Sequence, residues 1–503
     1  MTVKELEIED IHLLSSAFIF IIGSLLLVAS ILFVIDVTQS KDAIRRNYPV
    51  IGRFRYLFSS LGEFFRQYFF AMDREEMPFN RAEREWVSRA ANNKDNTTAF
   101  GSTKNLTPSG NIIFVNCPFP TLDEDAEKRI SLKIGPYCKT PYNAPSIFNI
   151  SGMSYGALST PAVRALSKGA KMADCWMNTG EGGLSPYHLE GGCDIVVQIG
   201  TAKYGVRDES GKLSTKKLQE IAALEQVKMF EVKISQGAKP GKGGILPASK
   251  ITAEIAKMRG IPQGQASISP NRHPEIDNNN ELLDFINHVR DLTGKPVGFK
   301  AVIGSPDWIE QLCQAIHTRG IESAPDFITI DSGDGGTGAA PMALMDNVGL
   351  PIKESLPLVA DTLQQYCLNK RIRLIASGKL ITPSEMAWAI ATGADFVTSA
   401  RGFMFSLGCI QSLRCNKNTC PTGITTHNPR LQKGLDPADK AVKVANYCNN
   451  MRQEIEVISH SCGVKRPRLM RRKHLRIVQD NGKSVPMDAL YPTPTPIEFE
   501  KIS

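Results

Sequence analysis

Apolar positions in the middle of the chain form short runs, and most runs precede a segment whose apolar residues recur with helical periodicity. Two such helical segments are "STPAVRALSKGAKMA" and "ELLDFINHVRDLTG". Repeated strand-then-helix units predict a parallel sheet covered by helices, and eight units close economically into a (β/α)8 TIM barrel. A doubly wound open sheet is the alternative. The predicted strands begin at Ser146, Cys175, Ile195, Met229, Val297, Phe327, Arg373 and Phe396.

A longer apolar stretch covers residues 11–35, where His12 is the only side chain that could carry a charge. It is long enough to cross a bilayer as a helix. A cleaved signal peptide would need a positive start and a shorter apolar run, whereas acidic residues precede this stretch. We therefore predict one transmembrane anchor. The positive-inside rule places the rest of the chain in the cytoplasm, because the helix is followed by Lys41, Arg45, Arg46, Arg53 and Arg55.

Residues 56–72, "YLFSSLGEFFRQYFFAM", form an aromatic-rich run interrupted by Glu63 and Arg66. This pattern suits a helix lying in the membrane interface better than a second crossing. An amphipathic helix packed on the main domain is the alternative. The sequence thus predicts four parts: a transmembrane anchor (1–40), a juxtamembrane helical segment and linker (41–110), a barrel (111–430), and a C-terminal helical extension and tail (431–503).

Composition narrows the choice of function. The excess of eight positive charges is scattered along the chain without dense basic runs, so we predict no nucleic-acid partner. The eleven cysteines are mostly isolated, which favours a reducing compartment over a disulfide scaffold.

Glycines and polar residues gather after the predicted strands, at the end of a barrel where active sites are built. After the last two strands, "ASGKL" and "SARGF" offer Gly378, Gly402 and the cation Arg401 for a phosphate group. "GDGGTG" (333–338) matches a dinucleotide fingerprint. However, it comes late in the strand series, and "APMALMDNVGLP" interrupts the helix that should receive the pyrophosphate.

From about Ile150 to Pro429 the chain resembles the flavin domain of glutamate synthases. The matching stretches are "SGMSYGALS", "NTGEGG", "KISQGAKPGKGG", "DSGDGGTGAAP" and "GCIQSLRCNKNTCPTGITT", in the family's order. The whole chain is most similar to a short, membrane-anchored branch of that family. A juxtamembrane segment "NYPVIGRFRY" followed by "PFNRAEREW" supports this similarity.

The resemblance implies a [3Fe–4S] cluster on Cys409, Cys415 and Cys420, in the loop after the last barrel strand. Three irons each need one external ligand, so three thiolates suffice. Two alternatives remain: three buried apolar cysteines, or a zinc site completed by His427.

The resemblance also implies FMN over the carboxyl ends of the strands. Lys300 would place a cation near the flavin ring, although it could equally be an ion-paired lysine inside the barrel. Ser154 and Gln236 are predicted ring or ribityl contacts. The remaining predicted cofactor residues are Gly335, Gly336, Gly378, Arg401 and Gly402.

In the family, reduced FMN passes a hydride to 2-iminoglutarate, which forms from 2-oxoglutarate and ammonia. Lys239 matches the family's substrate lysine, with Lys242 or Arg272 as possible assistants. Glu181 is a candidate proton donor or orienter of the imine. Ferredoxin or a separate NAD(P)H reductase is the expected electron donor.

Several departures from the family pattern limit this interpretation. No glutaminase domain is recognisable, so ammonia or an amine is expected from outside. Leu184 and Ile245 stand where the family tends to have polar residues, so the acceptor could differ from 2-iminoglutarate. Three hypotheses follow: a glutamate-forming oxidoreductase, a membrane-associated electron-transfer subunit, or a barrel that has lost its flavin and serves as a binding module.

Overall fold

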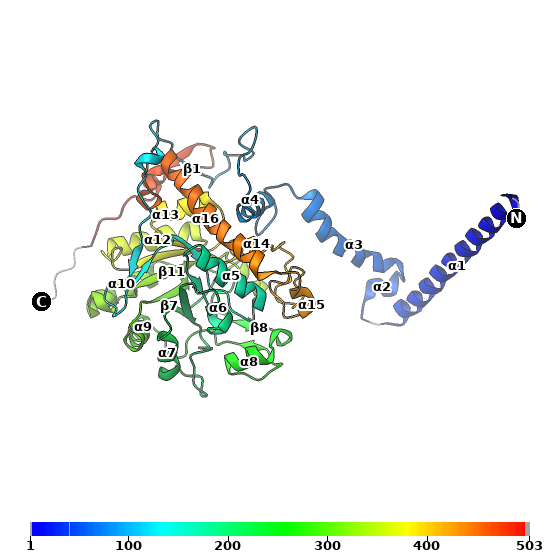
Figure 1. The fold of residues 1–503 in the computed structure, drawn as a ribbon, viewed down its shortest axis with the longest axis horizontal. Helices are drawn as coiled ribbons and strands as arrows, with labels where there is room; N and C mark the ends of the chain where they lie inside the picture. Colours follow the sequence, from blue (N-terminus) through cyan, green and yellow to red (C-terminus); the bar gives the residue numbers. More distant parts are fainter. Residues whose placement is uncertain (1–2, 40, 498–503) are drawn as a thin grey trace. The chain divides into compact units, whose positions relative to one another are not determined.

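The computed structural model of the protein describes residues 3–39 and 41–497, in two compact units, Met1–Arg81 and Ala82–Ser503 (Figure 1). The first unit contains α1 (Val3–Thr38), α2 (Ala43–Asn47), α3 (Ile51–Phe65) and a π-helical turn, η1 (Arg66–Phe70). Its segment His12–Thr38 is long and apolar enough to cross a membrane.

A buried carboxylate joins the helices of the first unit. Asp36, near the end of α1, accepts hydrogen bonds from Arg45 and Arg53, each with an N–O distance of 2.7 Å. The backbone N–H of Val50 also donates to Asp36 Oδ2, at 3.1 Å. The loss of hydration at Asp36 is therefore offset by two guanidinium groups and an amide, and α2 and α3 are tied to the end of α1.

The second unit is built on a closed parallel barrel with the order β10-β11-β12-β13-β4-β5-β6-β7. The pairing of β13 with β4 completes the closure, so the TIM-barrel prediction is confirmed and the open sheet is excluded. All eight predicted runs supply strands. The strands are β4 (Phe148–Ile150), β5 (Met177–Asn178), β6 (Ile195–Ile199), β7 (Val227–Lys233), β10 (Val297–Val302), β11 (Phe327–Asp331), β12 (Arg373–Ser377) and β13 (Phe396–Ser399).

Helices follow most strands, and local signals set their ends. The Ser159 side chain caps α5, and Thr382 with Glu385 forms a capping box on α13. The β5–β6 connection holds a 3-10 turn, η3 (Gly180–Gly182), and the short α6 (Pro186–Leu189). After β7 the chain inserts α8 (Ala253–Arg259) and a hairpin of β8 (Ile245–Leu246) and β9 (Ser267–Ile268). The longer barrel helices are α5 (Thr160–Met172), α7 (Thr215–Ala222), α9 (Asn279–Thr293), α10 (Asp307–Arg319), α12 (Ile352–Gln365) and α13 (Pro383–Thr392).

The C-terminal extension packs back on the barrel. Its long helix α16 (Pro437–Ser461) lies along α5 (Figure 1). A Cβ at Gly169 of α5 would lie 2.5 Å from the Val444 side chain, so this close approach requires glycine. Beyond α16 the extension also contains β14 (Leu475–Val478) and β15 (Ser484–Pro486), which form an antiparallel sheet with β1 (Ile112–Phe114).

A short hairpin closes the amino-terminal end of the barrel. It consists of β2 (Leu132–Ile134) and β3 (Tyr142–Ala144), whose apolar side chains join the core residues at the starts of the barrel strands. Trp176 is at the centre, with ring centroids 6.3 Å from Tyr142 and 5.0 Å from Phe396. The plugged end leaves the carboxyl ends of the strands as the face on which a site can form.

Trp176→Ala should destabilise the second unit by about 3–5 kcal/mol, because truncating a fully buried aromatic residue leaves a cavity that the closed barrel cannot fill. Denaturant unfolding of the full chain measures the change. The control Phe119→Ala, at a side chain that is 86 % exposed, should stay within about 0.5 kcal/mol of wild type. Equal stability of the two variants would contradict the role of the hairpin core.

Candidate active site

Four buried or largely buried charged side chains meet at the open end of the barrel. Lys233 ends β7 and lies beside Lys300 of β10 in the strand register. Lys233 Nζ is 3.0 Å from Glu181 Oε1, and Lys300 Nζ is 3.2 Å from Asp331 Oδ2. The strand ends therefore present two ion pairs rather than isolated charges.

Glu181 is held as a charged carboxylate. Burial acts to raise its pKa, but the positive charges of Lys233, Lys239 and Arg259 outweigh burial, and the pKa is lowered. A Cβ at Gly244 would lie 2.3 Å from Glu181 Oε1, so this glycine makes room for the carboxylate. A carboxylate that stays ionised suits the orientation of a cationic or imine nitrogen better than the donation of a proton.

Lys239 is the most unusual side chain in this region. It is 2 % exposed, and its ammonium has no hydrogen-bond or ion-pair partner in the part of the chain that the structure describes. Burial lowers its pKa to about 8, with Glu181 opposing and Lys233 adding to the shift. An unpaired buried cation is costly, which indicates a site prepared for an anion.

The loop that carries Lys239 is fixed to the loop after β11. The Gly237 N–H donates to Asp331 Oδ2 at 2.9 Å, and the Ala238 N–H donates to the Gly333 carbonyl at 2.9 Å. Of the predicted assistants, Lys242 is exposed, and Arg272 is exposed and paired with Asp277 at 2.6 Å. The structure therefore brings only Lys239 of these three cations into the interior.

Two interior cations were missed by the sequence analysis. The alternation of β7 places Lys233 inside, so strand periodicity could have found it. Arg259 ends α8 and is 5 % exposed, with its guanidinium over the Tyr204 ring and its Nε without a hydrogen-bond partner. Its position before Gly260 is typical of an ordinary helix end, so no short-range signal distinguished it.

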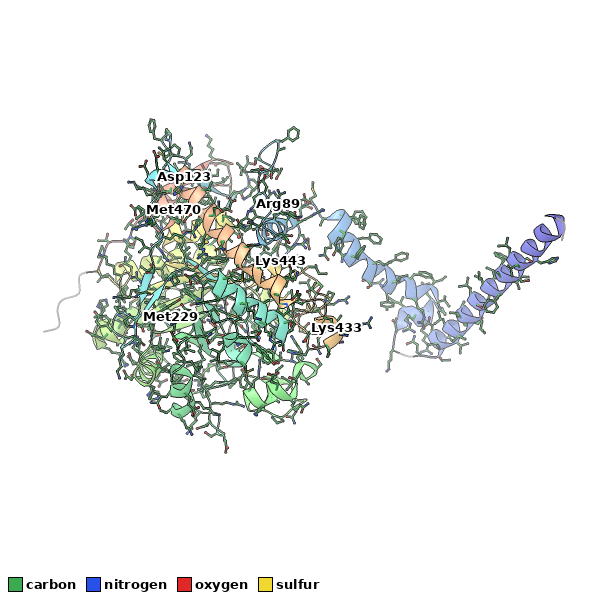
Figure 2. All side chains as sticks on the ribbon, viewed as in Figure 1. Arg89, Asp123, Met229, Lys433, Lys443 and Met470 are labelled. Carbon is green, nitrogen blue, oxygen red and sulfur yellow. The ribbon has the colours of Figure 1, made fainter. Side chains whose placement is uncertain are left out.

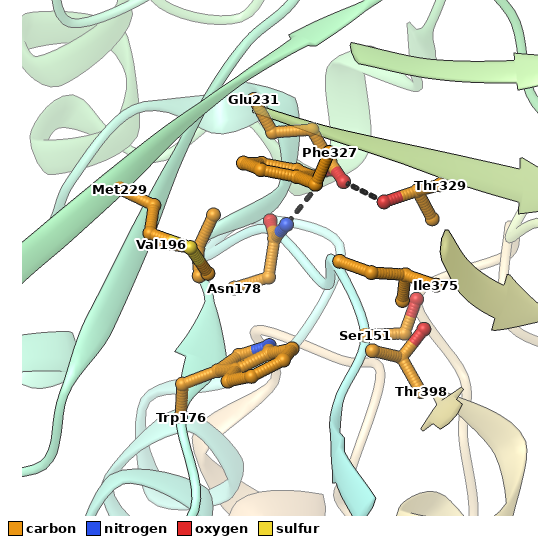
Figure 3. A pocket seen from close by; sticks show the side chains of 10 residues that line it. All are labelled: Ser151, Trp176, Asn178, Val196, Met229, Glu231, Phe327, Thr329, Ile375 and Thr398. Atoms are coloured by element: carbon orange, nitrogen blue, oxygen red, sulfur yellow. Dashed lines mark hydrogen bonds between the residues drawn. The ribbon is translucent and has the colours of Figure 1, made fainter. Parts of the chain in front are cut away.

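A polar layer lies inside the barrel between the plugged end and the charged mouth (Figure 3). Glu231 accepts hydrogen bonds from Asn178 Nδ2 at 2.8 Å and from Thr329 Oγ1 at 2.6 Å. Burial alone would lower the pKa of Lys300, but the carboxylates of Asp331 and Glu231 raise it. Lys300 is therefore held as a cation. It is an ion-paired lysine inside the barrel, which was one of the two alternatives in the sequence analysis.

The predicted phosphate residues Gly378, Arg401 and Gly402 follow β12 and β13, and the other predicted cofactor glycines, Gly335 and Gly336, follow β11. A Cβ at Gly336 would lie 2.8 Å from Arg401 Cζ, and one at Gly378 would lie 2.3 Å from Ser332 Cβ. Gly335 and Gly402 are equally confined, the latter by the Tyr447 hydroxyl at 2.2 Å. Glycine is required at these positions because the loops pack so closely that a side chain would clash with its neighbours.

The glycine-rich loop 333–338 belongs to the closed barrel and precedes the short α11 (Met342–Met345) and then α12. The dinucleotide interpretation is therefore not supported. Of the predicted flavin contacts, Gln236 Oε1 accepts a hydrogen bond from Lys233 Nζ at 2.6 Å. Ser154 packs on the Glu181 loop, where a Cβ at Gly180 would lie 2.6 Å from the Ser154 nitrogen.

The three motif cysteines follow α14 (Arg401–Ser406) and are close enough to influence one another electrostatically. Burial raises the pKa of Cys409 to about 11. Burial also acts to raise the pKa of Cys420, but hydrogen bonding, including that with the Thr422 hydroxyl, lowers it. Nearby, Lys250 Nζ donates to the Cys415 carbonyl at 3.2 Å. Within residues 3–39 and 41–497, no His, Cys, Asp and Glu side chains are arranged in a metal-binding group. His427 Nε2 instead bonds to the Gly156 carbonyl at 2.9 Å.

Comparison with known proteins identifies the family. The family described as "Conserved region in glutamate synthase" matches residues 104–465, more than half of the chain. The chain belongs to the glutamate synthase family. It is accordingly an oxidoreductase of the glutamate synthase type.

Relatives in this family cover much of the chain. The glutamate synthase large subunit-like protein YerD of Bacillus subtilis is 39 % identical over 498 residues, covering 91 % of this chain and 94 % of YerD. An archaeal glutamate synthase [NADPH] of Methanocaldococcus jannaschii is 36 % identical over 342 residues. That match covers 67 % of this chain and 63 % of the archaeal protein.

Among solved structures, a mutant flavocytochrome b2 with benzoylformate covers 83 % of this chain and 86 % of its own. Its sequence identity is 15 % and its TM-score 0.46, too distant to bear on the site. The site of this glutamate synthase family member is therefore inferred from the contacts of its own residues.

Proposed function

We propose that the protein is an FMN- and [3Fe–4S]-dependent oxidoreductase that reductively aminates 2-oxoglutarate or a related 2-oxo acid, using ammonia or an amine supplied from outside. The observation that carries this proposal is the buried Lys239 side chain at the mouth of the barrel, whose ammonium has no hydrogen-bond or ion-pair partner among the described residues. Such a group gains a charge-assisted hydrogen bond when an anionic substrate enters.

Lys239 and Arg259 would bind the carboxylates of the substrate. Both cations lower the pKa of Glu181, which supports a shared site for the three groups. Glu181, held ionised, would orient the nitrogen of the imine. Leu184 and Ile245 directly follow Gly183 and Gly244 in the loops around Glu181, and their apolar side chains favour a less polar 2-oxo acid.

The mouth of the barrel fits FMN by the chemistry of its donors. When bound, FMN supplies the hydride that reduces the imine. Lys300 would hold positive charge beside the ring, and Ser154, Gln236, Gly335 and Gly336 would line it. Gly378, Arg401 and Gly402 would contact the phosphate. Gly304 and Gly338 adjoin open space, since a Cβ at either position would meet nothing within 4 Å.

Cys409, Cys415 and Cys420 would hold the cluster, which relays electrons from ferredoxin or a separate reductase. Their fit rests on the mutual influence of the three thiols and on the hydroxyl of Thr422, which lies 3.4 Å from the Cys420 sulfur. The bond from His427 to Gly156 disfavours the zinc alternative. The second candidate function is an electron-transfer subunit that binds both cofactors. The apolar Leu184 and Ile245 favour it, because they remove polarity from the expected substrate pocket.

We further propose that α1 anchors the protein in a membrane with the second unit in the cytoplasm, and that α3 lies in the interface. The aromatic residues Phe54, Phe58 and Phe65 recur with helical spacing on α3 and are 50 %, 64 % and 42 % exposed. Ser59 falls on the other side of the helix, about 100–140° around from these aromatic residues. Continuity with the apolar span of α1 supports a lipid surface as the partner.

Lys239→Ala should slow oxidation of the reduced flavin by a 2-oxo acid plus ammonia by about ten- to a hundredfold, because a charge-assisted hydrogen bond is lost. Wild-type kcat/KM should also fall as pH rises past about 8, where Lys239 loses its charge.

Lys239→Arg should lack this alkaline decline because guanidinium stays charged. Stopped-flow absorbance measures both effects, with ferricyanide as an acceptor that does not need the substrate pocket. If wild type reacts with ferricyanide but with no 2-oxo acid, the electron-transfer subunit replaces the amination proposal.

Cys420→Ser should abolish the iron signal in electron paramagnetic resonance of the oxidised protein, because one iron loses its protein ligand. Cys367→Ser, at an exposed thiol, is the matched control and should retain the signal. Stoichiometric zinc in the wild-type protein, measured by metal analysis, would refute the cluster.

In bilayers containing brominated lipids, the full-length Phe58→Trp variant should show additional tryptophan fluorescence that the bromine atoms quench, because position 58 would lie among the acyl chains. Ser59→Trp, one residue along the same exposed helix, should add fluorescence that escapes quenching. Equal quenching of the two variants would contradict an interfacial α3.

A further inference from the structure

A second pocket lies at the amino-terminal end of the barrel, opposite the candidate active site. It is bounded by α16, by the chain just before β4, by η6 (Pro467–Leu469) with the residue before it, and by the segment preceding β2. In Figure 2 the label of Met470, which is two residues beyond Arg468, marks the end of α16 at which the pocket lies. The label of Lys433 marks the other end of this helix. The charged residues that line it are Glu127, Arg129, Arg452, Glu456, Arg466 and Arg468.

The pocket carries two more positive than negative charges. Arg129 Nε is 2.7 Å from Glu456 Oε1, and Arg466 Nη1 is 3.0 Å from Glu127 Oε2. Arg452 and Arg468 form no ion pair with the described residues. Arg468 instead donates to the Asp395 carbonyl and lies over the Phe396 ring, and Arg452 donates to Ser146 and Asn449.

Three guanidinium nitrogens of this pocket are buried without a hydrogen-bond partner. They are Nε of Arg452, Nε of Arg466 and Nη2 of Arg468. Arg452 is only 8 % exposed, and burial lowers the pKa of Arg468 to about 10. Buried donors in native proteins are nearly always satisfied, and an unpaired buried charge is costly.

One class of ligand would satisfy both the unpartnered guanidinium donors and the excess positive charge of the pocket. A water molecule would accept the hydrogen bonds but leave the charge unbalanced, whereas a doubly charged oxyanion does both. The remaining walls are apolar and offer a surface for an organic group: Ile130, Pro145, Ile147, Ile455 and Pro467.

We propose that this pocket is a binding site for a small phosphate monoester, with the phosphate on Arg452, Arg466 and Arg468 and the organic group against the apolar wall. The site is separate from the barrel mouth, so the inference goes beyond the proposed function and does not depend on it.

Calorimetric titration of the full-length, flavin-loaded protein tests the proposal with inorganic phosphate and with phenyl phosphate. Phenyl phosphate should bind at one site and more tightly than phosphate, because only the ester contacts the apolar wall. Arg466→Gln should weaken both ligands about tenfold or more through loss of a charge-assisted hydrogen bond. Glu127→Gln should strengthen both, because it frees Arg466 from its carboxylate.

Two controls separate this pocket from other anion sites. Arg164→Gln removes an arginine paired with Glu190 elsewhere and should leave both affinities unchanged. Lys239→Ala should also leave them unchanged. Absence of binding, or equal affinity in wild type and Arg466→Gln, would overturn the site. Loss of binding in Lys239→Ala alone would assign the phosphate to the barrel mouth and equally overturn it. Equal affinity for phosphate and its phenyl ester would overturn the monoester assignment.

Discussion

The ion pair between Lys233 and Glu181 is the interaction on which the open end of the barrel depends. It joins the end of β7 to the loop after β5, at 3.0 Å and largely out of solvent. A partly buried carboxylate without a neighbouring cation would shift toward its neutral form. The pairing with Lys233 helps to keep Glu181 ionised, and Lys239 can then lie nearby as an additional cation beside that carboxylate.

The barrel separates three layers with different chemistry. Tyr142, Trp176 and their neighbours fill the amino-terminal end with apolar side chains. Above them, Glu231 is satisfied by amide and hydroxyl donors, and the charged groups occupy the open end. The apolar layer excludes water from below, so electrostatic interactions at the mouth operate in a medium of lower polarity than the protein surface. This arrangement explains why Lys239 and Lys300 have pKa values shifted in opposite directions: Lys300 has carboxylate neighbours that outweigh burial, and Lys239 does not.

The same physical argument applies at both ends of the barrel. Lys239 at the mouth and Arg452 at the opposite end are each buried cations without a carboxylate partner within the described residues. In the first case the family and the surrounding loops supply a substrate hypothesis. In the second, the orphaned donors and the charge excess point to an oxyanion site that the chemistry of glutamate formation does not require.

The sequence by itself determined the eight strands, because each is a short apolar run bounded by turn residues and followed by a connection to a parallel neighbour. It also determined the apolar span of α1 and the motifs that place the chain in its family. Tertiary structure decided the closure of the barrel by β13 and β4 and the plug formed by β2 and β3, since these contacts join residues far apart in the chain. It also decided which cations are interior: Lys239 and Lys242 lie on one loop, yet only Lys239 is buried. Arg259 and the arginines around Arg452 carry no local signal, because burial and the absence of a partner are properties of the packed neighbours and not of the residue itself.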